Sequence, residues 1–351
     1  MILDIKNKRI WAVLLPLSIS VVAIAAVLKY TSSGATLSAI SKADVRFLIL
    51  ALILHIFFWI LWALRLWYLT SIVASKVSFG LALKATLASN FVSAVTPASA
   101  GGEPMRVKVL NDGGVSCGCG TAVIISERLL DSFFFVVALL ALLAVSNSAV
   151  GLGLEVGGLF LMIFILTLVL LWQLLRRPDK IEKVMAWLRK RFHSGILGSA
   201  VDFLDREIWI FRVAALRLIG CAKNQIPAML ALTVLMWLLE FMIPSVLLMG
   251  LGQSPHYLDS LVAQLIIILI AGLPLTPGSS GIVEFSMSYL YAGFVPDYLL
   301  GVLVLVWRTI TYFTNLVVGA PFAGTSLRCQ VMRQNNIGDN QLPGFEEDEI
   351  R

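Results

Sequence analysis

The sequence has little charge for its length. Only 14% of its 351 residues are Asp, Glu, Lys or Arg, whereas 59% are hydrophobic. In soluble globular domains, about a quarter of the residues are charged. The apolar residues fall in runs of ~20, the length that a helix needs to cross the hydrocarbon core of a bilayer. The scarcity of charge therefore excludes a soluble globular protein and predicts an integral membrane protein.

Cysteine and histidine are also scarce. Four cysteines in 351 residues are too few for a disulfide scaffold. Cys117-Gly118-Cys119 has no second pair or nearby histidine to complete four metal ligands. The sequence also lacks a glycine-rich nucleotide loop and a paired-aspartate run for Mg²⁺. We therefore expect no catalytic residues, no metal, no cofactor and no enzymatic activity.

Long apolar runs predict an all-α polytopic membrane protein with six spans, at 10–28, 47–69, 121–145, 152–175, 228–250 and 298–324. Two further runs, 79–110 and 258–294, are broken by Pro and Gly. Segment 176–223 is rich in Lys and Arg and has amphipathic helical spacing. Because basic loops stay on the cytoplasmic side, we expect this segment there, on the membrane surface. The charge of +6 thus indicates topology and not binding to nucleic acid.

Counting the crossings from a cytoplasmic N-terminus makes each broken run begin and end on one side. The two runs are therefore predicted to be re-entrant hairpins that enter from opposite faces. We expect one transmembrane domain over 1–325, a disordered tail over 326–351 and both termini in the cytoplasm. The expected location is the cytoplasmic membrane of a prokaryote.

The two broken runs carry similar hinges. Thr96-Pro97-Ala98-Ser99-Ala100-Gly101 and Thr276-Pro277-Gly278-Ser279-Ser280-Gly281 share four of six residues at an offset of 276 − 96 = 180. The same offset takes Arg128 to Arg308. Together with the opposite orientation of the hairpins, it predicts two inverted repeats, over about 47–145 and 227–324.

A chain that breaks inside a bilayer leaves backbone groups unpaired unless protein or a wet cavity satisfies them. Thr96, Ser99, Thr276 and Ser279 are suitable N-caps for the half-helices that follow the hinges. Free N–H groups at helix N-termini attract anions such as phosphate. Interrupted segments in both halves are typical of a transporter site near the midplane.

Two arginines are expected at equivalent depths in the membrane, where an ionised side chain costs at least ~2.5 kcal/mol. In one interpretation Arg128 and Arg308 are held by structural ion pairs or reach the surface. Arg128 and Asp131 can pair at a spacing of three, and Glu127 shares a helix face with Asp131. In the other interpretation both arginines converge with the hinges on a phosphate, for which guanidinium is a bidentate donor.

Acidic residues in the spans have two interpretations as well. Glu103 and Glu284 follow the hinges, and each either stabilises a helix N-terminus or titrates or contacts an amine headgroup. Glu127, Asp131, Glu240 and Glu284 are candidate proton carriers. Polar residues such as Arg65 are interpreted as interhelical hydrogen bonds or as ends that reach the surface.

Three motifs resemble those of a known family. They are Gly-Gly-Glu-Pro-x-Arg at 101–106, Glu-Arg-x-x-Asp at 127–131 and Pro-x-Thr-Pro-Gly-x-x-Gly-x-x-Glu at 274–284. Together they are similar to the flippase-like, lysylphosphatidylglycerol synthase transmembrane-domain family, over about 10–325. The resemblance implies movement of a lipid between leaflets. Bifunctional members add a soluble synthase domain, which we do not expect here, and stand-alone relatives are linked to polyprenyl-phosphate glycan or lipid pathways.

We therefore expect translocation of a phospholipid or polyprenyl-phosphate type of lipid. The rival hypotheses are a secondary transporter of a small organic anion, a lipid-modifying enzyme without recognised motifs, and a non-catalytic membrane partner of a lipid or glycan biosynthesis enzyme. Expected partners are anionic membrane lipids, and a homo-oligomer is left open. The predicted substrate-binding residues are Thr96, Pro97, Ser99, Gly101, Gly102, Glu103, Arg128, Thr276, Pro277, Ser279, Gly281, Glu284 and Arg308.

Overall fold

The structure is a computed structural model that describes residues 2–336, except 32, 75–76, 97–98, 146–149, 177, 192–194, 223–224, 273–275 and 277. Within these residues all regular structure is helical. The helices, in chain order, are α1 (Ile2–Thr31), α2 (Gly34–Ser41), α3 (Val45–Val73), α4 (Phe79–Val95), α5 (Gly102–Asp112), α6 (Cys117–Val145), α7 (Val150–Arg176), α8 (Pro178–Arg191), α9 (Gly195–Ala222), α10 (Ile226–Gly250), α11 (Tyr257–Ala271), α12 (Ile282–Tyr291), α13 (Asp297–Arg308), the π-helical turn η1 (Thr309–Phe313) and α14 (Thr314–Asn336).

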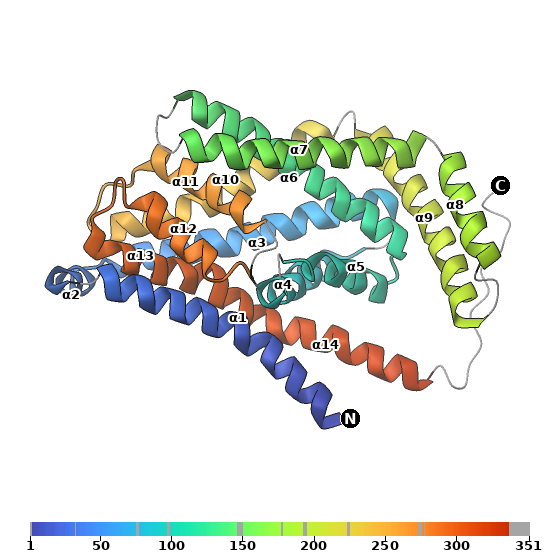
Figure 1. Cartoon of the computed structure of the whole chain (residues 1–351), viewed down its shortest axis with the longest axis horizontal. Helices are drawn as coiled ribbons and strands as arrows, with labels where there is room; N and C mark the ends of the chain where they lie inside the picture. Colours follow the sequence, from blue (N-terminus) through green and yellow to red (C-terminus); the bar gives the residue numbers. More distant parts are fainter. Residues whose placement is uncertain are drawn as a thin grey trace.

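Long helices run along the length of the molecule (Figure 1). Five segments are long and apolar enough to cross a membrane, namely Leu14–Thr31, Val45–Val73, Glu155–Arg176, Ile226–Gly250 and Asp297–Ser326. Each corresponds to one expected span. The sixth expected span is α6, a helix of 29 residues that carries three charged side chains near its middle. The prediction of an all-α polytopic membrane protein is confirmed.

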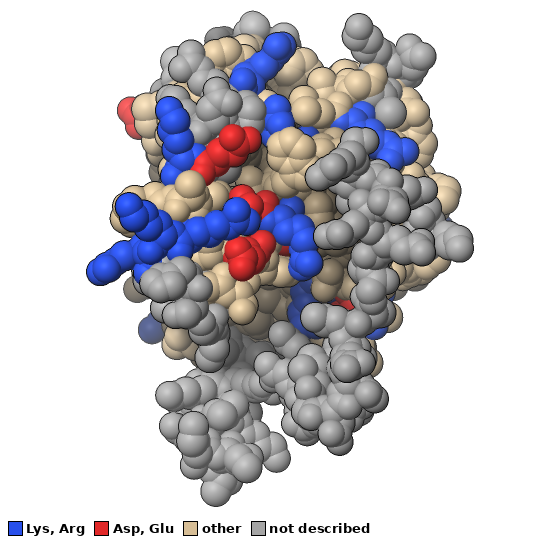
Figure 2. All heavy atoms as spheres, turned by 90° about the vertical axis from the view of Figure 1, so that its right-hand side faces the viewer, with Lys and Arg blue, Asp and Glu red and all other residues tan. Residues whose placement is uncertain are grey.

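The basic segment forms α8 and α9, which lie across one end of the bundle (Figure 1). The N-terminal end of α1 and the C-terminal end of α14 lie at this end too. Viewed onto this end, lysine and arginine side chains spread over the surface between fewer acids (Figure 2). The backbone N–H of Gly118, at the start of α6, donates to Glu207 of α9 at 2.6 Å. A Cβ at Gly118 would collide with the α9 backbone, so glycine permits this close approach.

Helix α14 extends further than expected. It continues past residue 325 to Asn336, so the prediction that residues 326–336 belong to a disordered tail is wrong. The N-terminal part of α14 is apolar. The residues after it continue the same series of backbone hydrogen bonds, which does not require apolar side chains. Residues 337–351, the remainder of the predicted tail, lie outside the described residues.

Two helical hairpins occupy opposite ends of the molecule (Figure 1). The α4–α5 hairpin lies toward the α8–α9 end, and α11–α12 lies toward α2. A hydrogen bond joins α2 to α13 at this end: the Thr36 hydroxyl of α2 donates to the carbonyl of Tyr298, at the start of α13, at 2.9 Å. Both runs predicted to be broken are thus broken. That the hairpins are re-entrant from opposite faces of the membrane, and that the two halves are inverted repeats, stays a prediction.

Helices α3 and α10, which the offset of 180 relates, pack side by side through the centre. Small side chains on α3, such as the fully buried Ala51 and Ala63, allow the two helices to approach closely. Aromatic rings fill the space beside them, with the Phe58 and Trp237 centroids 5.6 Å apart. This central pair holds the hairpins in place on either side.

Candidate functional site

The two hinges meet inside the molecule. The backbone N–H of Gly278 donates to the carbonyl of Thr96 at 2.9 Å, and the Tyr312 hydroxyl donates to the carbonyl of Ala94 at 3.0 Å. A Cβ at Gly278 would collide with the Ala94 carbonyl, and its φ of +58° is unfavourable for other residues. These bonds satisfy backbone groups that the broken helix α4 leaves free, as a membrane interior requires.

The first hinge is capped differently from the prediction. Thr96 ends α4, and its hydroxyl accepts from the N–H of Gly101 at 3.0 Å. Helix α5 begins after Gly101, which has no side chain to cap it. The prediction that Thr96 and Ser99 are N-caps is therefore wrong. The hinge is a turn between α4 and α5, and the hydrogen bond between Thr96 and Gly101 closes it. Ser99 has a left-handed φ of +56°, and Pro97 lies outside the described residues.

The second hinge shows the same correction. Helix α12 begins after Gly281, whose φ is +86° and whose N–H donates to the Glu284 carboxylate at 2.8 Å. The hydroxyl of Ser279 donates instead to the Ala271 carbonyl at 2.7 Å. Thr276 makes no side-chain hydrogen bond within the described chain. Neither Ser279 nor Thr276 is an N-cap: that position is Gly281, and Glu284, the third residue of α12, accepts from its N–H. Pro277 lies outside the described residues.

Arg308 pairs with the glutamate of the second hairpin. Its Nε lies 2.9 Å from Glu284 Oε1, and both side chains are buried. The hydroxyl of Ser20, on α1, donates to the same carboxylate oxygen. The π-helical turn that follows Arg308 brings the Tyr312 ring to 4.5 Å from the guanidinium carbon. Arg308 Nη2 has no hydrogen-bond partner within the described part of the chain. One donor of this arginine is therefore available.

Arg128 pairs with the glutamate of the first hairpin in the same way. Its Nε lies 2.5 Å from Glu103 Oε1, whereas the expected partner Asp131 is 4.0 Å away. Unlike the buried Arg308 pair, Arg128 and Glu103 have side chains 45% and 42% exposed. Arginines that the offset relates thus hold the glutamates of their own hairpins, one pair buried and one open.

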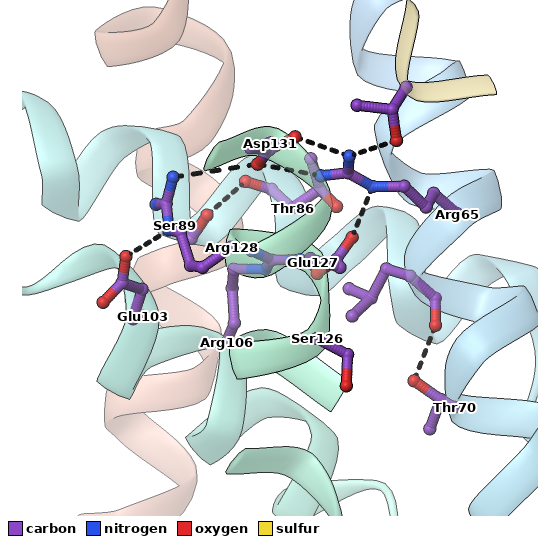
Figure 3. A network of polar contacts seen from close by, with 12 residues as sticks. Arg65, Thr70, Thr86, Ser89, Glu103, Arg106, Ser126, Glu127, Arg128 and Asp131 are labelled. Atoms are coloured by element: carbon purple, nitrogen blue, oxygen red, sulfur yellow. Dashed lines mark hydrogen bonds and ion pairs between the residues drawn. The ribbon is translucent and has the colours of Figure 1, made fainter. Parts of the chain in front are cut away.

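A buried network lies behind Arg128 (Figure 3). Arg65 of α3 donates to both carboxylate oxygens of Asp131, at 2.6 and 3.1 Å, and to Glu127 at 3.2 Å. Arg106 of α5 pairs with the second oxygen of Glu127. The indole N–H of Trp237 donates to Asp131 at 2.9 Å. Arg65 is completely buried, so these acids compensate a charge that would otherwise be prohibitive in the membrane.

Sequence reasoning missed the roles of Arg65 and Arg106. Each had a signal: Arg65 lies near the middle of an apolar run, where a charge marks a buried partner, and Arg106 lies one turn beyond Glu103. The expectation that Glu127 and Asp131 share a face is confirmed, since both contact Arg65. The interpretation of Arg65 as a residue that reaches the surface is wrong, because two acids hold it inside.

Both hinges and both arginines line one cavity of about 440 Å³. Of the predicted substrate-binding residues within the described chain, the cavity wall contains Ser99, Glu103, Arg128, Ser279 and Arg308. The others among them are not part of the wall. Gly101 and Gly102 leave space for the side chains of Thr96, Val92 and Ser93. The convergence that the sequence predicted for the hinges and arginines is thus present in the geometry.

An apolar groove of about 550 Å³ adjoins the cavity. It runs between α6 and α7, from Phe160 to Leu174 along α7, with Phe211 of α9 beside it. Arg128, Ser132 and Phe160 line both the groove and the cavity. The sequence offered no signal for this groove, because it depends on how far apart two apolar helices lie.

A further polar pair links the central helices. Nδ1 of His55, on α3, lies 2.9 Å from Oε2 of Glu240, on α10, with side chains 1% and 17% exposed. Glu240 lines the cavity. The sequence analysis singled out Glu240 but not its histidine partner, because the two residues are 185 positions apart.

Comparisons with known proteins agree with the sequence motifs. The family described as "Lysylphosphatidylglycerol synthase TM region" matches residues 13–319. A UPF0104 membrane protein of Archaeoglobus fulgidus is 39% identical over 312 residues, which cover 88% of this chain and 95% of the relative. UPF0104 membrane proteins of Methanothermobacter thermautotrophicus and Pyrococcus horikoshii are 26% and 24% identical over 90% and 81% of this chain, and over 96% and 88% of the relatives. No solved structure matches.

Proposed function

Because the chain belongs to the family of the lysylphosphatidylglycerol synthase transmembrane region, we propose that it moves a phosphate-bearing lipid between the leaflets of its membrane. The observation that carries the proposal is the cavity in which both hinges, Arg128 and Arg308 come together. The role is that of a transporter and not of an enzyme.

The arginines supply the chemistry for a phosphate headgroup. Arg308 lines the cavity, and its buried Nη2 has no hydrogen-bond partner within the described chain. Arg128 also lines the cavity and has a half-exposed side chain beside Glu103. Guanidinium binds phosphate oxygens through two parallel charge-assisted hydrogen bonds. The ion pairs already compensate the charge of each arginine. The site is therefore stable without a ligand and still has hydrogen-bond donors for an anion.

The adjoining groove favours a lipid over a small soluble anion. It follows α7 from residue 160 to residue 174, a rise of roughly 21 Å at 1.5 Å per residue. One leaflet of the hydrocarbon core is ~15 Å thick, so an acyl or prenyl chain fits along the groove. Arg128 lines both the groove and the cavity, so a headgroup would enter the cavity while its tail stays in apolar surroundings.

The orientation follows from the basic end. Helix α8 and the surface around it carry many lysine and arginine side chains (Figure 2), and positive loops remain in the cytoplasm. We place this end, with both chain termini, on the cytoplasmic side of a prokaryotic membrane. The groove reaches Leu174, close to α8, so the lipid would be taken from the cytoplasmic leaflet.

Headgroup-resolved lipid scrambling in proteoliposomes tests the function. Wild-type protein is expected to speed the exchange of a phosphate-bearing lipid between leaflets, and Arg308→Ala to abolish most of that acceleration. Arg189→Ala is the matched control, because Arg189 is an exposed arginine paired with Asp202 and Asp205 on the α8–α9 surface. Equal rates for wild type and Arg308→Ala would reject the site. If the protein carried a soluble phosphate ester across the membrane but moved no lipid, the rival hypothesis of a soluble-anion transporter would be favoured.

A further inference from the structure

The cavity contains one acid whose partner is a titratable base and not an arginine. Within the described chain, the charged side chains that line the cavity are Glu103, Arg128, Asp131, Glu240 and Arg308. Glu103 is held by Arg128, and Asp131 by Arg65. Glu240 instead contacts His55.

Acids held by arginine are poor proton carriers. Protonating Asp131 would remove one acid from the buried Arg65, and protonating Glu284 would leave the guanidinium of Arg308 without its ion-pair partner. A buried arginine cannot release its own proton in exchange, and an unpaired buried charge is strongly destabilising. The same holds for Glu127, which lies between Arg65 and Arg106. These pairs are therefore expected to keep their charges throughout the cycle.

The His55–Glu240 pair has the opposite properties. Imidazole and carboxylate can each gain or release a proton, whereas guanidinium cannot release one in a protein. His55 is packed against Phe58 and Trp59, with ring centroids at 6.1 and 4.8 Å. Its Nε2 has no hydrogen-bond partner within the described chain. Because Glu240 lines the cavity and His55 is almost fully buried, Glu240 is the point of contact between the pair and the cavity.

The pair also sets the net charge around the cavity. Around the hinges four arginines, Arg65, Arg106, Arg128 and Arg308, face four acids, Glu103, Glu127, Asp131 and Glu284, in ion pairs. Their charges cancel, so the state of the pair decides the sum. Neutral imidazole beside ionised Glu240 makes the sum −1, and one added proton makes it zero. An anionic headgroup therefore enters more easily when the pair is protonated.

We propose that His55 and Glu240 form a proton-binding pair that couples lipid movement to a pH gradient. The proposal rests on the proposed function. A proton passes from a hydronium ion in the cavity to the pair, leaving water behind, and returns to water on the other side. No other bond is made or broken. Proton and anionic lipid consequently travel in the same direction.

Transport with an imposed pH gradient tests the coupling. In proteoliposomes, wild-type protein is expected to move a phosphate-bearing lipid faster out of the acidic side than into it. In Glu240→Gln and His55→Gln the ratio of the two rates is expected to fall to one. Glu155→Gln, at an exposed position of α7, is the matched control and should keep the wild-type ratio. Glu240→Asp, which keeps the carboxylate, should retain a ratio above one. A wild-type ratio of one, or an unchanged ratio in Glu240→Gln, overturns the coupling.

Proton binding can be measured without transport. The His55 ring lies edge to face with Trp59, so protonation of the pair should change indole fluorescence. A pH titration of purified protein is expected to show a step in wild type that is missing in His55→Gln and present in Glu155→Gln. Identical titrations in all three overturn the proton-binding pair. If the titration shows the step but no lipid moves in any liposome, the proposed function fails while the proton site stands.

Discussion

The carbonyl of Thr96 accepts a hydrogen bond from the backbone N–H of Gly278 at 2.9 Å, although 182 residues separate them (278 − 96). The bond joins two chain breaks that enter the molecule from opposite ends (Figure 1). The bond pairs one backbone group of each break, as a membrane interior requires. Described residues of both hinges line the cavity together with Arg128, Arg308 and Glu103.

Gly278 should tolerate no larger residue. In Gly278→Ala the new Cβ would collide with the Ala94 carbonyl at a left-handed φ, which alone costs about 1–2 kcal/mol. We expect a clear fall in the temperature of unfolding in detergent. Gly293→Ala is the matched control, because nothing lies within 4 Å of a Cβ there. Equal unfolding temperatures for the two variants would contradict the close contact of the hinges.

Removing a buried arginine should destabilise far more than removing the open one. Arg65→Ala leaves Asp131 with the Trp237 indole and the more distant Arg128, and Glu127 with Arg106, which should cost ~3–5 kcal/mol. Arg128→Ala breaks a half-exposed pair, for which ~1 kcal/mol or less is expected. Denaturant unfolding of the two variants measures the difference. If Arg65→Ala had the same free energy of unfolding as wild type, the ion-pair network of Figure 3 would not contribute to stability.

The guanidinium group should matter beyond its charge. Arg308→Lys keeps one positive charge but loses the planar pair of donors that suits phosphate. We expect lipid movement in Arg308→Lys to fall by roughly tenfold, equivalent to about 1.4 kcal/mol of lost binding. The readout is the concentration dependence of scrambling for lipids with and without phosphate. A loss of the same size for both lipids would indicate a structural role for Arg308 and not recognition of phosphate.

Filling the groove should slow a lipid but not a soluble anion. Thr167 of α7 lines the groove, whereas its neighbour Leu166 does not. Thr167→Trp is therefore expected to reduce lipid scrambling several-fold, while Leu166→Trp, which points an added ring toward the exposed side of α7, should leave the rate near wild type. If both variants scramble at equal rates, the groove is not the path of the tail.

Much of the architecture could be predicted because it depends on local chemistry. Runs of about twenty apolar residues require helices that cross the bilayer, and each of the six expected spans corresponds to a long helix. Pro and Gly in 79–110 and 258–294 predicted breaks, which are present. The matching hinges also predicted that Arg128 and Arg308 would share a cavity with them, and both line it.

The partners of individual side chains were harder to predict. The sequence favoured Asp131 as the partner of Arg128 from their spacing along one helix. Glu103, on another helix, lies closer. In this case Asp131 is already held by Arg65 of a third helix. Likewise, spacing suggested that Thr276 and Ser279 cap α12, but the N-cap is Gly281, whose N–H donates to the Glu284 carboxylate. A carboxylate forms a stronger charge-assisted bond with an N–H group than a hydroxyl does.

The sequence by itself determined that this is a membrane protein, where its long apolar helices lie, the two breaks and the charges that must be compensated, since each of these follows from the cost of placing polar groups in hydrocarbon. Only the tertiary structure decided which charges compensate one another, that the groove between α6 and α7 adjoins the cavity, and that His55 faces Glu240. Those contacts join residues far apart in the chain, and their distances depend on how whole helices pack, which no local pattern of residues records.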